Sequence, residues 1–170
     1  TGALKMFLLS RHQKLFKALE DRDFGLAAEL IKAGADVNKP DSNRRPPLIS
    51  VASRQDAAML RFLLDKGADP NVTGEGGFAL LRASANGSVE CVRILLDLQA
   101  SVDQADATGL TSLMVASYLD HPETIDELVR AGANLEQRDE KGYTALIFAS
   151  NTKYVCPVRK LISVGADVNA

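Results

Sequence analysis

The side chains in this 170-residue sequence best suited to metal binding or nucleophilic catalysis are two histidines and two cysteines. His12 and His121 have no cysteine or carboxylate at the spacing of a zinc finger or of a helical ligand pair. No histidine is placed to activate Cys91 or Cys156, so we interpret both as structural or surface thiols. We therefore expect no metal site, no cofactor and no catalytic centre.

A glycine-rich stretch and a set of periodic aspartates are the other candidates for chemistry. The glycines at 74–77 suggest a phosphate-binding loop, but no Lys-Ser/Thr pair follows and no strand precedes them, so we interpret this stretch as a turn. The aspartates are too far apart for a catalytic pair, and we interpret them as turn residues that accept hydrogen bonds from nearby backbone N–H groups. They are Asp36, Asp69, Asp103 and Asp167.

Composition narrows the setting and the partners. The formal net charge of -2 predicts no general attraction to nucleic acid. The sequence contains no run of about 18 apolar residues, so we expect no direct insertion into a membrane. Two cysteines do not make a disulfide framework, so we expect a cytoplasmic or nuclear setting.

An internal repeat positions all of these side chains. Two independent markers, a Gly-Ala-Asp-like turn and a leucine, recur with the same period. The turns begin at Gly34, Gly67, Gln99, Gly132 and Gly165, spaced 33, 32, 33 and 33 residues apart. The leucines are Leu48, Leu80, Leu113 and Leu146, spaced 32, 33 and 33.

The last repeat shows how each unit is built. Residues 139–143 suit a turn, and Thr144 is a natural N-cap for a short helix over 145–150. A second helix carries Leu161 and Ile162 on one apolar face. Neither helix is long enough to be stable alone, so the units must stack on one another.

These units resemble the ankyrin repeat. The Thr-Pro-Leu-His-x-Ala motif of that family is matched by residues 46–51, 78–83, 111–116 and 144–149. The leucine is kept in all four, whereas the histidine is replaced by Ile49, Leu81, Met114 and Ile147. The resemblance implies an all-α solenoid of stacked helix-turn-helix units with β-turn or hairpin tips. It also implies that losing the histidine weakens the hydrogen bonds between neighbouring turns.

We expect five segments along the chain. Residues 1–40 form an N-terminal lead-in helix, over about 1–13, and a capping repeat. Full repeats occupy 41–73, 74–105, 106–138 and 139–170. Pro157 is expected to delay the start of the last helix, and both cysteines to lie on the outward side of their helices. Because the last repeat has no polar closing helices, we expect further repeats to follow it.

The resemblance implies a protein or linear peptide as partner, bound on the concave face formed by the tips and the first helices. The candidate binding residues on that face are Arg45, Arg54, Glu75, Leu110, Tyr118, Leu119, Lys141 and Tyr143. Leu110, Tyr118, Leu119 and Tyr143 would form an apolar, aromatic patch across repeats three and four. The alternative is that Tyr118 and Leu119 only pack between repeats.

Charge by segment refines the expected partner. Residues 74–105 carry two basic and four acidic side chains, and residues 106–138 carry two and six. An acidic middle argues against a nucleic-acid groove along the solenoid and suits a peptide with an apolar anchor and a basic flank.

Three other expectations concern modification, assembly and context. Ankyrin repeats can be hydroxylated on an asparagine after the turn, eight residues after a leucine, which fits Asn38, Asn71 and Asn169; the alternative is a purely structural turn asparagine. We expect a monomeric domain, with end-to-end association through the last repeat as the alternative. An alternative function is a regulatory or scaffolding ankyrin domain of a larger multidomain enzyme or channel.

Overall fold

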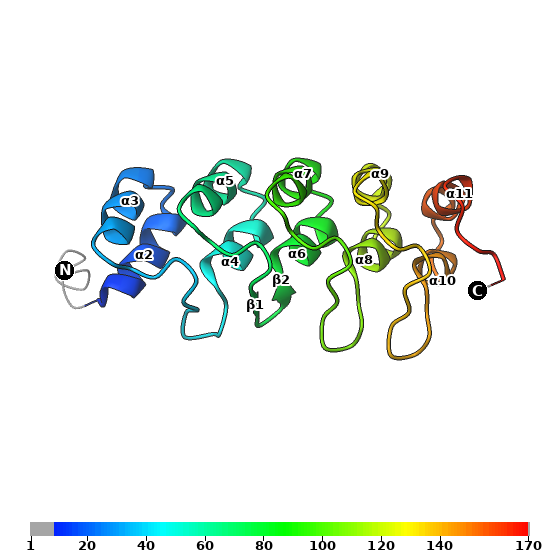
Figure 1. Cartoon of the computed structure of the whole chain (residues 1–170), viewed down its shortest axis with the longest axis horizontal. Helices are drawn as coiled ribbons and strands as arrows, with labels where there is room; N and C mark the ends of the chain where they lie inside the picture. Colours follow the sequence, from blue (N-terminus) through cyan, green and yellow to red (C-terminus); the bar gives the residue numbers. More distant parts are fainter. Residues whose placement is uncertain (1–8, 170) are drawn as a thin grey trace.

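The computed structural model describes residues 9–169 as a single row of paired helices with the connecting tips projecting to one side (Figure 1). The inner helices are α2 (Arg11–Glu20), α4 (Pro47–Ser53), α6 (Ala79–Ala85), α8 (Ser112–Tyr118) and α10 (Ala145–Ser150). The outer helices are α3 (Phe24–Lys32), α5 (Ala57–Asp65), α7 (Val89–Asp97), α9 (Pro122–Arg130) and α11 (Val155–Ser163). The first pair occupies the place of the expected capping repeat and keeps that name below, and the next four pairs are called repeats one to four. The predicted all-α solenoid is confirmed.

The helix starts follow from side-chain caps. Thr144 accepts a hydrogen bond from the backbone N–H of Ile147, as the sequence predicts, and Thr111 caps α8 in the same way. Ser10 and Gln13 form a capping box that starts α2 at Arg11. The expected lead-in helix therefore does not extend to residue 13, because its last residues belong to the capping repeat. The rest of that expected helix, residues 1–8, lies outside the described residues.

The tips are held by aspartates in three repeats and by a hairpin in the other. The Oδ1 atoms of Asp41, Asp106 and Asp139 each accept hydrogen bonds from the N–H groups two and four residues ahead. The tip of repeat two has Thr73 at this position instead, and forms the antiparallel pair β1 (Thr73–Gly74) and β2 (Gly77–Phe78). This hairpin begins one residue before the expected start of repeat two at residue 74. Gly76 and Gly77 both have positive φ in this turn, at 93° and 96°.

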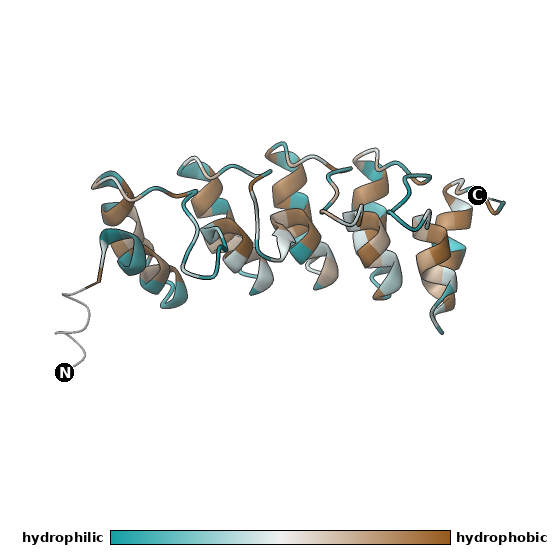
Figure 2. Cartoon of the chain, turned by 90° about the horizontal axis from the view of Figure 1, so that it is seen from below, coloured by the Kyte–Doolittle hydropathy of each residue, from teal (hydrophilic) through white to brown (hydrophobic). Residues whose placement is uncertain are grey.

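The core lies between the two rows of helices and between successive repeats. At least one leucine of each outer helix in repeats one to four is completely buried: Leu60 and Leu63 in α5, Leu95 in α7, Leu128 in α9 and Leu161 in α11. Figure 2 shows hydrophobic stretches in every helix and hydrophilic stretches in the connecting turns. Ile162, expected on the same face as Leu161, is instead 47% exposed. It lies beside the buried face of α11, where no described element covers it.

Two further expectations need correction, one about the position of Pro157 in its helix and one about the exposure of the cysteines. Pro157 does not delay α11, which begins at Val155 and carries the proline in its first turn. The N–H groups of a first turn have no partner within the helix, so the proline costs no hydrogen bond there. Cys91 is fully buried rather than outward, whereas Cys156 is exposed.

A ladder of polar side chains links the Gly-Ala-Asp-like turns of neighbouring repeats. Asn38 and Asn71 each use both ends of the amide. In Asn71, Oδ1 accepts from the N–H of Ser101 at 2.7 Å and Nδ2 donates to the carbonyl of Gln99 at 3.2 Å. Asp103 and Glu136 continue the ladder as acceptors from Asn134 and Asp167.

The ladder gives the turns a polar connection that does not use the missing histidine. Of the four residues that replace this histidine, Ile49, Leu81 and Met114 are buried. Met114 also accepts a hydrogen bond at its sulfur from the N–H of Thr111. Asp36, Asp69 and Asp167 accept from N–H groups of their own turns, as predicted.

Ion pairs join neighbouring repeats on the outer helices. Glu127 on α9 pairs with Arg93 on α7 at 2.6 Å and with Arg130 on its own helix. Hydrogen bonds from these two arginines hold the pKa of Glu127 below its usual value. Asp126 on α9 pairs in turn with Lys160 on α11 at 2.9 Å.

Removing the amide of Asn71 should destabilise the stack. We expect Asn71→Ala to lower the free energy of unfolding by about 1–2 kcal/mol, because two hydrogen bonds between repeats are lost. Denaturant unfolding followed by circular dichroism measures this. Asn169→Ala is the matched control, since Asn169 is exposed and, among the described residues, only its backbone N–H forms a hydrogen bond. Equal effects of the two substitutions would contradict a structural role for the ladder.

The depressed pKa of Glu127 predicts a pH-dependent contribution to stability. Because its folded pKa lies below the unfolded value, this contribution is present at neutral pH and is lost as the pH falls below 4.5, its usual pKa, through the folded value. Glu127→Gln should lower the free energy of unfolding by about 0.5–1 kcal/mol at pH 7. The difference from the unsubstituted protein should shrink as the medium is acidified. Glu140→Gln, at an exposed tip, should show neither effect.

Candidate protein-binding surface

The surface formed by the tips and the uncovered side of helices α4, α6, α8 and α10 is called the inner face here. A leucine and an alanine of each inner helix point into the core. The residue directly after the replaced histidine therefore lies on the inner face. That position is occupied in successive repeats by Ser50, Arg82, Val115 and Phe148, all partly exposed. The fold fixes where these side chains lie but does not dictate their type.

Three rings from repeats three and four form an aromatic cluster on the inner face: Tyr118, Tyr143 and Phe148. Tyr118 is 49% exposed and Tyr143 is 40% exposed. Both rings meet Phe148 edge to face, with centroids 6.4 Å and 6.1 Å away. Tyr118 therefore packs across the repeat boundary and still presents a large apolar surface to a partner.

The other two residues of the predicted patch lie on either side of α8. Leu119, directly after the helix, is 40% exposed. Leu110 is half-buried and lines a groove of about 640 Å³ between the β1–β2 hairpin and the tip of repeat three. Val115 and Leu81 line the same groove.

Sequence reasoning missed Phe148 and Arg82. Both occupy the unspecified position of the Thr-Pro-Leu-His-x-Ala motif, where a fold-determined residue is not needed. A large aromatic or charged residue at that position was the sequence signal that could have identified them as binding candidates.

The charged candidates do not converge on one site. Arg45 is half-buried, and Arg54 is exposed and donates from Nε to the carbonyl of Ser50 at 3.3 Å. Glu75 and Lys141 are exposed at the tips of repeats two and four. These four charged residues are spread along the inner face. Of the eight predicted binding residues, Tyr118 and Tyr143 are the two that contact one common side chain, that of Phe148.

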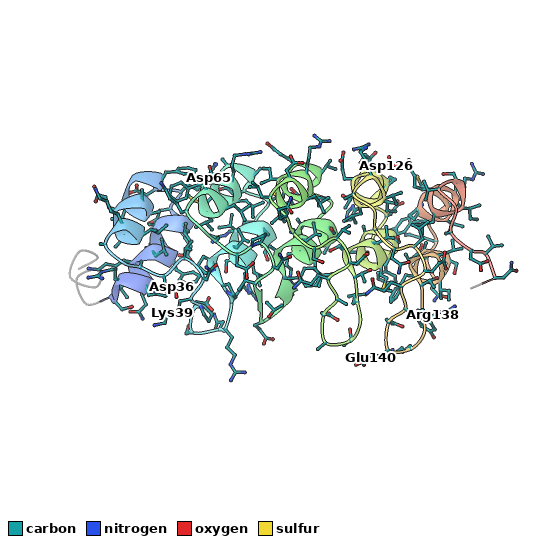
Figure 3. The ribbon with its side chains drawn as sticks, viewed as in Figure 1. Asp36, Lys39, Asp65, Asp126, Arg138 and Glu140 are labelled. Carbon is teal, nitrogen blue, oxygen red and sulfur yellow. The ribbon has the colours of Figure 1, made fainter. Side chains whose placement is uncertain are left out.

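Half of the acidic residues of repeats two and three lie on the outer helices, away from the inner face. Five of the ten acidic residues between 74 and 138 belong to the outer helices α7 and α9. Figure 3 shows Asp126 on the outer row and Glu140 at a tip on the opposite side of the molecule. Segment charge alone therefore gives no reason for a basic flank in a peptide bound on the inner face.

Both histidines are bound to backbone carbonyls. Nε2 of His12 lies 3.2 Å from the carbonyl of Lys39, and Nε2 of His121 lies 3.0 Å from that of Ala85 in the preceding repeat. Residues 9–169 contain no group of three or more His, Cys, Asp or Glu side chains arranged to hold a metal ion. Within the same range, no helix has the length and apolar character needed to cross a membrane.

The three asparagines proposed for hydroxylation differ in their surroundings. Asn38 and Asn71 are half-buried and their amides belong to the inter-repeat ladder. Asn169 is exposed. The ladder gives a structural reason for asparagine at the first two positions, and hydroxylation stays a prediction.

Comparison with known proteins agrees with this architecture. A family model described as ankyrin repeats in three copies matches residues 15–106 and 98–170. The chain belongs to the ankyrin-repeat family. Ankyrin repeats are generally modules for protein–protein interaction, and the family is typically non-catalytic.

Several curated proteins share this ankyrin region. Ankyrin repeat, SAM and basic leucine zipper domain-containing protein 1 of Dasypus novemcinctus is 33% identical over 124 residues, which is 70% of this chain and 26% of that protein. Zygote-specific protein 3 of Chlamydomonas reinhardtii is 31% identical over 61% of this chain and 28% of its own length. Protein lin-12 of Caenorhabditis elegans is 30% identical over 62% of this chain and 7% of its own length. The chain thus spans a quarter or so of the first relatives and much less of lin-12.

The two thiols should differ sharply in reactivity. Burial raises the pKa of Cys91 and keeps reagents away, whereas Cys156 is exposed. We expect Ellman's reagent to titrate one thiol promptly in the native protein and the second only in denaturant. Cys156→Ser should abolish the prompt reaction, and Cys91→Ser should leave it intact. Two prompt thiols in the native protein would contradict the burial of Cys91.

Proposed function

We propose that this ankyrin domain binds a protein, through a linear peptide segment, on the inner face at repeats three and four. The observation that carries the proposal is the aromatic cluster, which leaves two tyrosine rings 49% and 40% exposed around a half-buried phenylalanine. Rings that are already packed lose little side-chain entropy on binding and offer large apolar area, which is typical of binding anchors. Leu110 and Leu119 extend the apolar surface to either side.

The neighbouring groove favours a peptide over a flat protein surface. It runs from the β1–β2 hairpin to the tip of repeat three, with Leu110 and Val115 on one side. An extended segment can follow it while placing one side chain on the aromatic cluster. The tip residues Glu75 and Lys141 and the arginines Arg45 and Arg54 are then rim contacts, which contribute less to affinity than buried anchors.

The same proposal includes a non-catalytic, monomeric domain in a cytoplasmic or nuclear setting, without a nucleic-acid partner. Burial and a raised pKa make Cys91 a poor nucleophile, and both histidines are bound to carbonyls. A second candidate is a regulatory or scaffolding domain within a larger enzyme or channel. Its support is that the chain matches only about a quarter of the length of multidomain relatives.

The test is peptide selection on the purified 170-residue protein. Random linear 12-residue peptides, displayed between flanking sequences on phage, are selected and the enriched peptides are synthesised for affinity measurement. Replacing Leu110, Tyr118 and Tyr143 together by alanine should weaken binding about 100-fold or more, since hot-spot side chains contribute 2 kcal/mol or more each.

The control removes three exposed apolar side chains elsewhere. Ile162, Val164 and Val168 are 47%, 37% and 63% exposed at the end of repeat four. Their joint replacement by alanine should leave peptide affinity unchanged. Circular dichroism and thermal unfolding establish that both triple variants are folded. The proposal would be overturned if the triple variant of Leu110, Tyr118 and Tyr143 bound the peptides with unchanged affinity. It would also be overturned if the selection enriched no peptide at all.

A further inference from the structure

A single charged residue stands in the inner helices of the four full repeats. Helices α4, α6, α8 and α10 consist of apolar, small and hydroxyl-bearing side chains apart from Arg82 on α6. Arg82 occupies the inner-face position that Val115 and Phe148 occupy in repeats three and four. Along this one position, the charged Arg82 of repeat two is therefore followed by the apolar Val115 and Phe148 of repeats three and four.

The guanidinium of Arg82 has no protein partner within residues 9–169. Neither an ion pair nor a side-chain hydrogen bond joins it to another described residue. By contrast, Arg54 donates to the carbonyl of Ser50 and Arg93 pairs with Glu127. A partly buried guanidinium presents a planar set of donors that matches a carboxylate, and such pairing is screened less than on an open surface.

The groove is shaped around this side chain. Arg82 lines it together with Gly76 and Gly77 of the hairpin. A Cβ at Gly76 would overlap the guanidinium, and one at Gly77 would overlap the side chain of Leu81. The glycines therefore leave room that larger residues would fill.

One other charged residue lines the groove, and one of its carboxylate oxygens already accepts three hydrogen bonds. Oδ1 of Asp106 accepts hydrogen bonds from the N–H and hydroxyl of Thr108 and from the N–H of Leu110. Asp106 makes no ion pair with Arg82. The positive charge of Arg82 is thus left for a ligand.

We propose that the inner face selects extended peptides in which an aspartate or glutamate side chain pairs with Arg82 and an apolar side chain packs on the aromatic cluster. This inference rests on the proposed function and adds the chemistry that the partner must have. It replaces the basic flank expected from segment charge with an acidic residue.

The repeat geometry sets the spacing between the two determinants. Arg82 and Phe148 are two repeats apart, and packed helices lie about 10 Å from one another. An extended chain advances about 3.3 Å per residue, so about six residues separate the acidic side chain from the anchor. Side chains alternate in an extended chain, so residues six apart share a face. A small apolar side chain two or four residues after the acidic one would face Val115.

The carboxylate is assigned to an internal side chain rather than to a peptide C-terminus. The inner face continues past Arg82 into repeat one, where Ser50 and Ser53 are small and partly exposed. The row of repeats continues on both sides of α6, to α4 on one side and to α8 on the other (Figure 1). A bound chain can therefore run on beyond the carboxylate.

The test uses the peptides enriched on the unsubstituted protein by the selection described above. They should share an acidic residue about six positions from an aliphatic or aromatic residue. Changing that acidic residue to its amide should weaken binding about 10- to 100-fold, because a charge-assisted pair is lost. The same change should have little effect on binding to Arg82→Gln, as a double-mutant cycle requires.

Charge reversal and a matched arginine provide the controls. Selection on Arg82→Glu should enrich lysine or arginine at the position that was acidic. Arg61→Gln removes an exposed arginine from the outer helix α5 and should leave both affinity and selected sequences unchanged. Because the amide substitution is made in the peptide, it tests the pairing even if an Arg82 variant folds poorly.

The outcomes separate this inference from the proposed function. Peptides that require Tyr118 and Tyr143 but bind equally well with the amide would overturn the role of Arg82 and leave inner-face binding intact. Loss of binding only on amidation of a free peptide C-terminus would assign the carboxylate to the terminus and overturn the internal side chain. Failure to enrich any peptide would overturn both proposals.

Discussion

No single repeat of this chain can bury its own apolar side chains, and the rest of the structure depends on that constraint. The inner helices of the full repeats have six or seven residues, well below the length at which a helix is stable alone in water. Stacking completely buries at least one leucine in each outer helix of the full repeats, as at Leu95 and Leu128. Each repeat is therefore folded by its neighbours, and the stack behaves as one cooperative row.

Polar groups make this stacking specific in register. Apolar faces of leucine and alanine could slide against one another, but the ladder through Asn38, Asn71, Asp103 and Glu136 joins one turn to the next at a defined position. On the outer helices, Glu127 and Asp126 link repeat three to both neighbours. The ladder also explains how the solenoid keeps its turns connected although the motif histidine is absent from every repeat.

The same constraint leaves the inner face free to vary. Core positions must be apolar to stack, whereas the uncovered position of each inner helix has no structural demand on its type. Ser50, Arg82, Val115 and Phe148 at that one position differ in size, polarity and charge. Such variation on an invariant frame is the physical basis on which repeat proteins present different surfaces to different partners.

The sequence by itself determined the architecture, because the repeat period, the leucines and the turn residues act locally or between adjacent units. It also located the cap at Thr144 from its position in the motif. Only the tertiary structure decided how these residues meet. Burial of Cys91, exposure of Ile162 and the contact of two tyrosines with Phe148 depend on which face of one repeat covers the next. Charge shows this limit most clearly. A count of charges along the chain made the middle repeats acidic, whereas helix packing places half of their acidic residues on the outer helices. Arg82 is the one charged residue in the inner helices of the four full repeats.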